Sequence, residues 1–206
     1  MLKDKLIQKF SDYGPFRAII VFGLFFLATY LITNHLTWAA PWQLPLFPFE
    51  RNLPFMPWTV FIYMTTYVGV VIAIPLFARR DLPRAMAAMI SMAVFLGIIF
   101  LLFPTVYPRP PLPTGLSPFT EYIYRLFTVI DTARNCFPSE HVAGVLFVSL
   151  VLLRRNRAIG VLFLVWSAFI AISTLTVKQH YAFDLVGGAA VAVIFYYWFF
   201  IKNHDA

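Results

Sequence analysis

This chain of 206 residues has few charged residues and almost no cysteine. Charged side chains make up 12% of it, about half of the share in ordinary soluble domains, whereas hydrophobic residues make up 61%. This composition excludes an ordinary soluble domain and predicts an integral membrane protein. The single cysteine, Cys136, has no partner for an internal disulfide bond and therefore says nothing about the redox compartment.

The sequence also lacks the patterns of a metal site or a nucleic-acid-binding surface. There is no cysteine cluster, no His-Glu-x-x-His motif and no repeated acidic pattern, so we expect neither a metal nor another cofactor. The net charge is +7, but the basic residues lie mostly between apolar runs and form no stripe, which argues against nucleic acid as a partner. No internal repeat divides the chain, and we expect one membrane domain over residues 1–206.

Apolar runs of membrane-spanning length account for most of the sequence. We place six of them, at about residues 16–33, 58–78, 85–107, 139–153, 159–176 and 182–201. Such runs must be helical in lipid, because unpaired backbone groups find no water there. The sequence thus predicts an all-α bundle of six transmembrane helices, in which Gly187-Gly188 permits close approach of the last helix to a neighbour.

A segment at residues 36–57, dense in proline, phenylalanine and tryptophan, separates the first two runs. We expect it to lie in the membrane interface as a partly irregular or short amphipathic element. Two interpretations remain open: it guides a lipid tail towards a site, or it is an aromatic anchor that sets the depth of the helices.

Lysine and arginine set the expected orientation. With the N-terminus in the cytoplasm, the inner segments hold eleven of these residues and the outer segments five, which predicts that both termini are cytoplasmic. The loops that follow the third and fifth runs then face outward. We therefore expect any site built from these loops at the outer face, on the periplasmic side of a bacterial inner (plasma) membrane.

His180 and Asp184 stand where the last apolar run begins. On a helix, residues four apart share one face, so we expect the two side chains to touch. A carboxylate bonded to one ring nitrogen leaves the other nitrogen free as a nucleophile, and it stabilises the cation formed when imidazole attacks phosphorus. The alternative is an acidic residue in a first helical turn, where it interacts favourably with the helix dipole.

The segment Pro138-Ser139-Glu140-His141 is typical of a capped helix start. Free backbone N–H groups at such a start attract phosphate, and His141 would be placed to give a proton to a leaving oxygen. The alternative is a capped span with a histidine at the membrane interface.

Three cations lie near these motifs in the sequence. Arg109 belongs to a stiff proline-rich segment after the third run, Lys178 precedes His180 by two residues, and Arg134 comes just before Pro138. A guanidinium group can donate two parallel hydrogen bonds to two oxygens of one phosphate. Together the three cations would neutralise transition-state charge in place of a metal ion.

Taken together, Arg109-Pro110, Pro138-Ser139-Glu140-His141 and Ser173 with His180-x-x-x-Asp184 resemble the type 2 phosphatidic acid phosphatase superfamily. The pattern of that family is a lysine and Arg-Pro, then Pro-Ser-Gly-His, then Ser-Arg and His-x-x-x-Asp. The resemblance covers about residues 81–201. It implies a six-helix membrane bundle that needs no metal and acts on lipid phosphates or diphosphates.

The resemblance also implies a role for each matching residue. His180 is the nucleophile that forms a phosphohistidine, and Asp184 orients it. His141 protonates the leaving alcohol and then activates the water or hydroxyl group that releases the phosphate. Arg109 and Ser139 bind phosphate oxygens.

Three positions depart from the family pattern. Leu102 stands where the pattern has lysine, Glu140 where it has glycine, and Thr174 where it has arginine. Two phosphate-binding cations are thus missing, and we hypothesise that Lys178 and Arg134 replace them.

One part of the chain looks more like a particular branch of the superfamily. Residues 176–181, with residues 53–57 upstream, resemble the branch that contains inositol phosphorylceramide synthases. That branch includes lipid phosphotransferases as well as phosphatases, so the resemblance leaves open whether water or another hydroxyl group is the acceptor.

These observations favour a metal-independent lipid phosphatase acting through a phosphohistidine at the outer membrane face. Phosphatidic acid, phosphatidylglycerol phosphate and polyprenyl diphosphate suit the site equally. A phosphotransferase that passes a phospho-head group to a hydroxyl acceptor is the alternative at the same site. A small transporter or a non-catalytic membrane protein is the alternative of another class.

Overall fold

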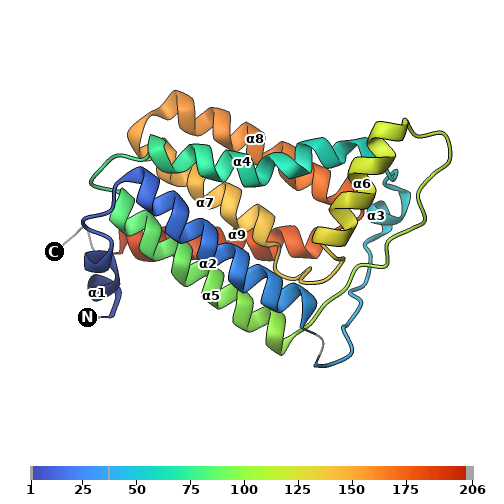
Figure 1. Cartoon of the computed structure of the whole chain (residues 1–206), viewed down its shortest axis with the longest axis horizontal. Helices are drawn as coiled ribbons and strands as arrows, with labels where there is room; N and C mark the ends of the chain where they lie inside the picture. Colours follow the sequence, from blue (N-terminus) through green and yellow to red (C-terminus); the bar gives the residue numbers. More distant parts are fainter. Residues whose placement is uncertain (1, 37, 203–206) are drawn as a thin grey trace.

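The computed structural model describes residues 2–36 and 38–202, and every regular element in these ranges is helical, which confirms the predicted all-α class. The elements are α1 (Leu2–Lys9), α2 (Pro15–His35), α3 (Pro48–Asn52), a 3-10 turn (Pro57–Thr59), α4 (Val60–Leu76), α5 (Leu82–Leu102), α6 (Pro118–Ile130), α7 (Glu140–Arg155), α8 (Arg157–Thr176), α9 (Ala182–Tyr196) and a π-helical turn (Tyr197–Ile201). Figure 1 shows the long helices side by side as a bundle.

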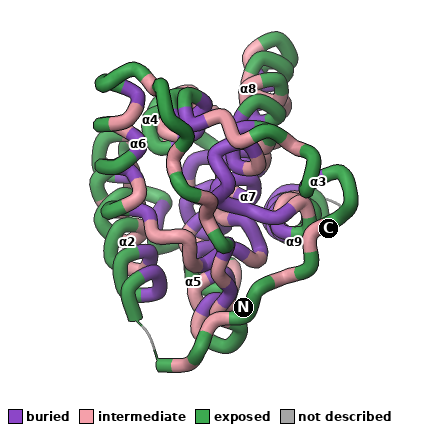
Figure 2. The backbone as a smooth tube through the Cα atoms, turned by 90° about the vertical axis from the view of Figure 1, so that its right-hand side faces the viewer, coloured by how far each residue is buried: buried purple, intermediate pink, exposed green. Residues whose placement is uncertain are grey.

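Helix α7 lies at the centre of this bundle. It packs against α4, α8 and α9, and most of its length is buried while the surrounding helices expose their outer faces (Figure 2). Many of the outward residues are large and apolar, as a lipid environment requires.

Five of the predicted spans correspond to helical segments long and apolar enough to cross a membrane. These are Pro15–His35, Pro57–Leu76, Leu82–Leu102, Arg157–Thr176 and Ala182–Ile201. The predicted span 139–153 corresponds to α7, which has 16 residues and is shorter than the other five. The total of six spans stays a prediction.

Two boundaries differ from the sequence prediction. The run predicted for residues 85–107 is helical only to Leu102, because Pro104 follows and the chain continues in an extended conformation. Helix α6 lies inside the segment predicted as the outer loop. It begins at Pro118, where the Ser117 hydroxyl accepts a hydrogen bond from the Thr120 N–H at 3.1 Å, a common helix start.

The two described ends of the chain lie at the same end of the bundle, opposite α3 and α6 (Figure 1). Lys3 Nζ donates to the carbonyl of Trp198 at 3.0 Å, which joins α1 to the last helix. The side of the membrane that each end faces stays a prediction.

The segment 36–57, whose described part is irregular apart from α3, lies over the end of the bundle opposite the termini. Its Glu50 is 3% exposed and caps helix α9, because one carboxylate oxygen accepts the Ala182 N–H at 2.7 Å. The other oxygen accepts the Phe47 N–H at 2.8 Å. Negative charge at a helix N-terminus is stabilising, so this segment fixes the start of α9.

Helices α7 and α9 meet through their main chains at the same end. The Ser139 N–H donates to the carbonyl of Asp184 at 3.0 Å. A Cβ at Gly188 would come within 2.4 Å of the Ser139 carbonyl oxygen, and one at Gly187 within 2.7 Å of the Phe137 ring. The predicted close approach at this glycine pair is therefore confirmed.

Candidate active site

His180 and Asp184 touch, as predicted, although His180 lies before α9 rather than on it. Nδ1 of His180 is 3.1 Å from Asp184 Oδ2 and 3.0 Å from the Cys136 carbonyl oxygen. Asp184 is the third residue of the helix, and its Oδ2 also accepts the Tyr181 N–H at 2.8 Å, which bends the chain back over the helix start. Both neighbours of Nδ1 are acceptors, so Nδ1 carries the proton and Nε2 keeps its lone pair.

His141 lies in the first turn of α7 with its ring next to that of His180. The ring centroids are 5.6 Å apart, and both side chains are buried. Nε2 of His141 forms a hydrogen bond with the Tyr63 hydroxyl and lies 3.5 Å from Asp131 Oδ2. The two histidines of the sequence motifs thus share one site.

Asp131, at the end of α6, lies beside His141 and is 2% exposed. Its carboxylate accepts hydrogen bonds from Tyr30, Tyr63 and, at 2.8 Å, Gln179 Nε2. Burial alone would raise the pKa of this carboxyl, but the nearby His141 and the hydrogen bonds from Tyr30 and Tyr63 outweigh burial and hold the pKa below its usual value. Asp131 is therefore a hydrogen-bond acceptor inside the site.

Arg109 reaches the site from the extended segment after α5. Its guanidinium donates to Gln179 Oε1, with Nε at 2.8 Å, and to the Asp131 carbonyl at 2.6 Å. The group also lies 5.2 Å from the Phe127 ring centroid. These bonds use Nε and Nη2, so the Nη1 donors are the ones left for an incoming phosphate.

Ser139 has the predicted capping position at the start of α7. It is fully buried, and its hydroxyl oxygen accepts the Val142 N–H at 3.4 Å. A helix start leaves backbone N–H groups without helical partners, and this start lies beside the two histidines, which suits an anion.

The two other predicted phosphate ligands are less directly connected. Lys178 is 8% exposed, and its Nζ donates to the Leu53 carbonyl at 2.7 Å. Arg134 pairs through its backbone with Val106, and within the described ranges no hydrogen bond or ion pair links its side chain to the histidines. The structure brings together Arg109, Ser139, His141, His180 and Asp184, and leaves the replacement hypotheses for Lys178 and Arg134 untested.

The departures from the family pattern have structural counterparts. Leu102, where the pattern has lysine, is 61% exposed on the surface of α5. Thr174, where it has arginine, is fully buried, and its hydroxyl donates to the Ala171 carbonyl at 2.7 Å. Neither position provides a cation to the site. Among the described residues, no group of His, Cys, Asp and Glu is arranged to hold a metal ion.

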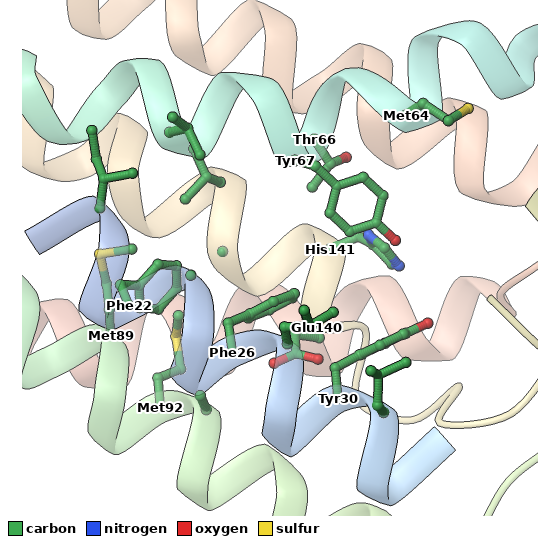
Figure 3. Close-up of a pocket in the computed structure, with 18 of the residues that line it drawn as sticks. Phe22, Phe26, Tyr30, Met64, Thr66, Tyr67, Met89, Met92, Glu140 and His141 are labelled. Carbon is green, nitrogen blue, oxygen red and sulfur yellow. The ribbon is translucent and has the colours of Figure 1, made fainter. Parts of the chain in front are cut away.

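An apolar cavity of about 440 Å³ opens next to His141. It runs between α2, α4, α5 and α7, with Tyr30, Tyr67 and His141 at one end and Phe22, Met89 and Met92 at the other (Figure 3). Glu140, which stands in place of the family's glycine, also lines it. No residue from the described part of 36–57 lines this cavity, and both interpretations of that segment stay open.

Sequence reasoning missed several residues of the site. Asp131 carried one usable signal, because it is one of only nine acidic residues and lies near the start of an apolar run. Tyr30 and Tyr63 carried none, since tyrosine is common in this chain, and Gln179 carried only its place in the segment 176–181. Their roles depend on which helices meet around His141.

A helical membrane bundle with a histidine pair and a carboxylate at one end, beside an apolar cavity, defines a class of enzymes that transfer phosphoryl groups of lipids. A family model of the PAP2 superfamily matches residues 33–198, and the chain belongs to this superfamily. This confirms the type 2 phosphatidic acid phosphatase resemblance of the three motifs.

One characterised relative is similar to part of the chain. It is undecaprenyl-diphosphatase BcrC of Bacillus subtilis (strain 168), which is 33% identical over 104 residues. The match covers 50% of this chain and 50% of that protein.

Proposed function

We propose that this protein is a metal-independent membrane lipid phosphatase that acts through a phosphohistidine. The observation that carries the proposal is the geometry of His180, Asp184 and His141 beside the apolar cavity. His180 has its Nδ1 proton fixed by two acceptors, so Nε2 keeps the lone pair that a nucleophile needs. The family membership and the diphosphatase relative support the same chemistry.

The first chemical step forms the phosphoenzyme. Nε2 of His180 attacks phosphorus, the bond to the leaving oxygen breaks, and His141 gives that oxygen a proton. Asp184 stabilises the positive charge that develops on His180. Arg109 and the N-terminus of α7 at Ser139 hold the phosphate oxygens, with Lys178 and Arg134 as further candidate ligands.

The second step releases phosphate. His141, now neutral, takes a proton from water, and the water oxygen attacks the phosphorus of the phosphohistidine. The N–P bond breaks, inorganic phosphate leaves, and both histidines return to their starting states. A hydroxyl acceptor in place of water would give a phosphotransferase through the same intermediate.

The cavity supports a substrate with one hydrocarbon chain. Along α2 it extends from Tyr30 to Ile19, about 16 Å at 1.5 Å per residue, or half of the roughly 30 Å hydrocarbon core of a bilayer. Its volume of about 440 Å³ and its apolar lining suit part of a hydrocarbon chain.

The proposed substrate is therefore a single-chain lipid phosphate or diphosphate, of which a polyprenyl diphosphate is the best example. The relative's name refers to undecaprenyl diphosphate, which supports this choice over diacyl substrates. The excess of basic residues in the predicted inner segments supports a site on the extracytoplasmic side.

Phosphate release by the purified protein tests the proposal. In detergent and with a chelator present, the protein should release phosphate from a polyprenyl diphosphate faster than from phosphatidic acid. His180→Ala should abolish both turnover and any acid-labile phosphoenzyme. His35→Ala, which changes an exposed histidine outside the site, is the matched control and should keep activity.

Retained turnover in His180→Ala would overturn the nucleophile assignment. Transfer of a head group between lipids without phosphate release would show a phosphotransferase instead.

A further inference from the structure

The buried carboxylate of Asp131 belongs to none of the three family motifs, yet it contacts the histidine proposed as the acid. It meets His141 in two ways, directly at 3.5 Å from Nε2 and through the Tyr63 hydroxyl, which is hydrogen-bonded to both groups. The Tyr63 ring also packs on the His141 ring at a centroid distance of 4.4 Å. Asp131, Tyr63 and His141 therefore form one connected group.

The direction of these hydrogen bonds follows from counting protons. Arg109 donates to Gln179 Oε1, so Gln179 Nε2 must donate to Asp131. The carboxylate thus serves as an acceptor, and the single hydroxyl proton of Tyr63 points to it. The Tyr63 oxygen is then left to accept from His141, which requires a proton on Nε2 of the ring. With Nε2 protonated, Nδ1 is the nitrogen that gains and loses a proton.

We propose that Asp131, acting through Tyr63, is a positioning residue that fixes the proton on Nε2 of His141 and makes Nδ1 the atom that exchanges a proton with the leaving group. This inference rests on the proposed phosphatase function and names the working nitrogen of its acid. The two histidines are then oriented in opposite senses, since His180 is held through Nδ1 and reacts at Nε2.

The carboxylate has a second effect on the reaction. His141 must hold two protons before the leaving oxygen departs, and a buried imidazolium ion is costly without a counter-charge. Asp131 provides that charge within 3.5 Å. Its other donors, Tyr30, Tyr67 and Gln179, spread the negative charge without neutralising it.

Replacing Asp131 by asparagine should disturb this proton arrangement. A neutral amide no longer compels the Tyr63 proton to point away from His141, so Tyr63 is free to donate to Nε2 and the working tautomer is lost. A carboxylate-to-amide change beside a catalytic histidine acts in this way in serine proteases. General acid catalysis contributes about 100-fold to 10,000-fold, and the loss should fall within this range for a leaving group that needs protonation.

The leaving-group dependence of kcat/KM tests this role. Two single-chain phosphates of equal apolar length are compared, an alkyl phosphate and an alkyl-substituted nitrophenyl phosphate, whose phenolate leaves without protonation. Asp131→Asn should lower kcat/KM for the alkyl phosphate about 100-fold or more, and for the nitrophenyl phosphate less than about tenfold. Tyr63→Phe, which keeps the ring, should show the same selectivity to a smaller extent.

Tyr30→Phe is the matched control. It also removes a hydrogen bond to Asp131, but no hydrogen bond joins its hydroxyl to His141, so it should change kcat/KM for both substrates by the same factor. If Asp131→Asn does not fold, Tyr63→Phe alone decides the question.

Equal losses on both substrates in Asp131→Asn and Tyr63→Phe would overturn the inference, because a structural role does not distinguish leaving groups. Unchanged or raised activity in Asp131→Asn would overturn it too, and a rise would indicate a carboxylate that competes with phosphate. Failure of the proposed function is distinguishable, because it appears as phosphate release that persists in His180→Ala.

Discussion

The side chain of Lys178 is buried, and burial changes the pKa of its ammonium group. Burial lowers the pKa of Lys178 below its usual value, although the nearby charge of Glu50 acts in the opposite direction. If Lys178 binds phosphate as proposed, rising pH removes its proton and its attraction for the anion earlier than for an ordinary lysine. We therefore expect kcat/KM to fall at alkaline pH.

Two variants check this expectation through pH profiles of kcat/KM. Lys178→Arg keeps its charge throughout and should shift the alkaline fall to higher pH. Lys178→Met should lower kcat/KM about tenfold or more at neutral pH, since a hydrogen bond to a charged group contributes about 1.5–3 kcal/mol. Lys9→Met, an exposed change at the other end of the bundle, should have no effect. An unchanged profile in Lys178→Arg would leave Lys178 only as the partner of Leu53.

At this scale, the sequence predicted the contact between His180 and Asp184 better than the surroundings of the candidate site. The spacing of His180 and Asp184 correctly predicted contact, but the contact arises from a helix start rather than from one helical face. Asp131 and Tyr63 were missed because a hydrogen bond between α4 and the end of α6 depends on tertiary packing. Short-range spacing carries no information about such partners.

On the scale of the elements, Glu50 makes the start of α9 depend on a distant segment. Its carboxylate accepts the Ala182 N–H, two residues beyond His180. We expect Glu50→Ala to destabilise the protein by about 1–2 kcal/mol, the usual effect of losing a helix cap, and to lower kcat/KM because His180 loses its support. Thermal unfolding in detergent and phosphate release measure the two effects.

Glu121→Ala is the comparison for Glu50. Its ion pair with Arg125 is exposed on α6 and should contribute less than about 1 kcal/mol. An equal loss of stability in both variants would contradict a capping role for Glu50.

The elements themselves were predictable to the extent that they are apolar and long. Hydropathy located the long helices within a few residues, because lipid permits little else. Helix α6 was not foreseen, because its proline-bounded outer segment was interpreted as a loop, although Ser117-Pro118 is a typical helix start. The capping role of Glu50 was not foreseen either, because it joins residues 132 positions apart.

On the scale of the whole molecule, the depth of the cavity should determine which chain lengths are accepted. Gly144 and Gly23 both line it, and a Cβ at either position would meet no atom within 4 Å. Gly144 is three residues from His141, whereas Gly23 is about 10 Å further along α2 than Tyr30. Gly144→Phe should therefore reduce kcat/KM for all single-chain phosphates, and Gly23→Phe only for long ones.

A series of single-chain phosphates of increasing length measures this difference. Gly14→Leu is the control, because Gly14 has equally open space but lies outside the cavity. The same length profile in Gly23→Phe and in the unchanged protein would contradict the placement of the tail.

The main-chain hydrogen bond between α7 and α9 holds the two histidine segments together, whereas the wall of the cavity is formed partly by another helix. The bond from the Ser139 N–H to the Asp184 carbonyl, at 3.0 Å, ties the two histidine-bearing segments together by backbone in the interior. The cavity, by contrast, is lined partly by α2. Only 11% of the apolar membrane-spanning stretch of α2 is buried inside the protein. If the cavity binds the lipid as proposed, we therefore expect changes in bilayer thickness or lateral pressure to affect substrate capture more than the distance between the two histidines.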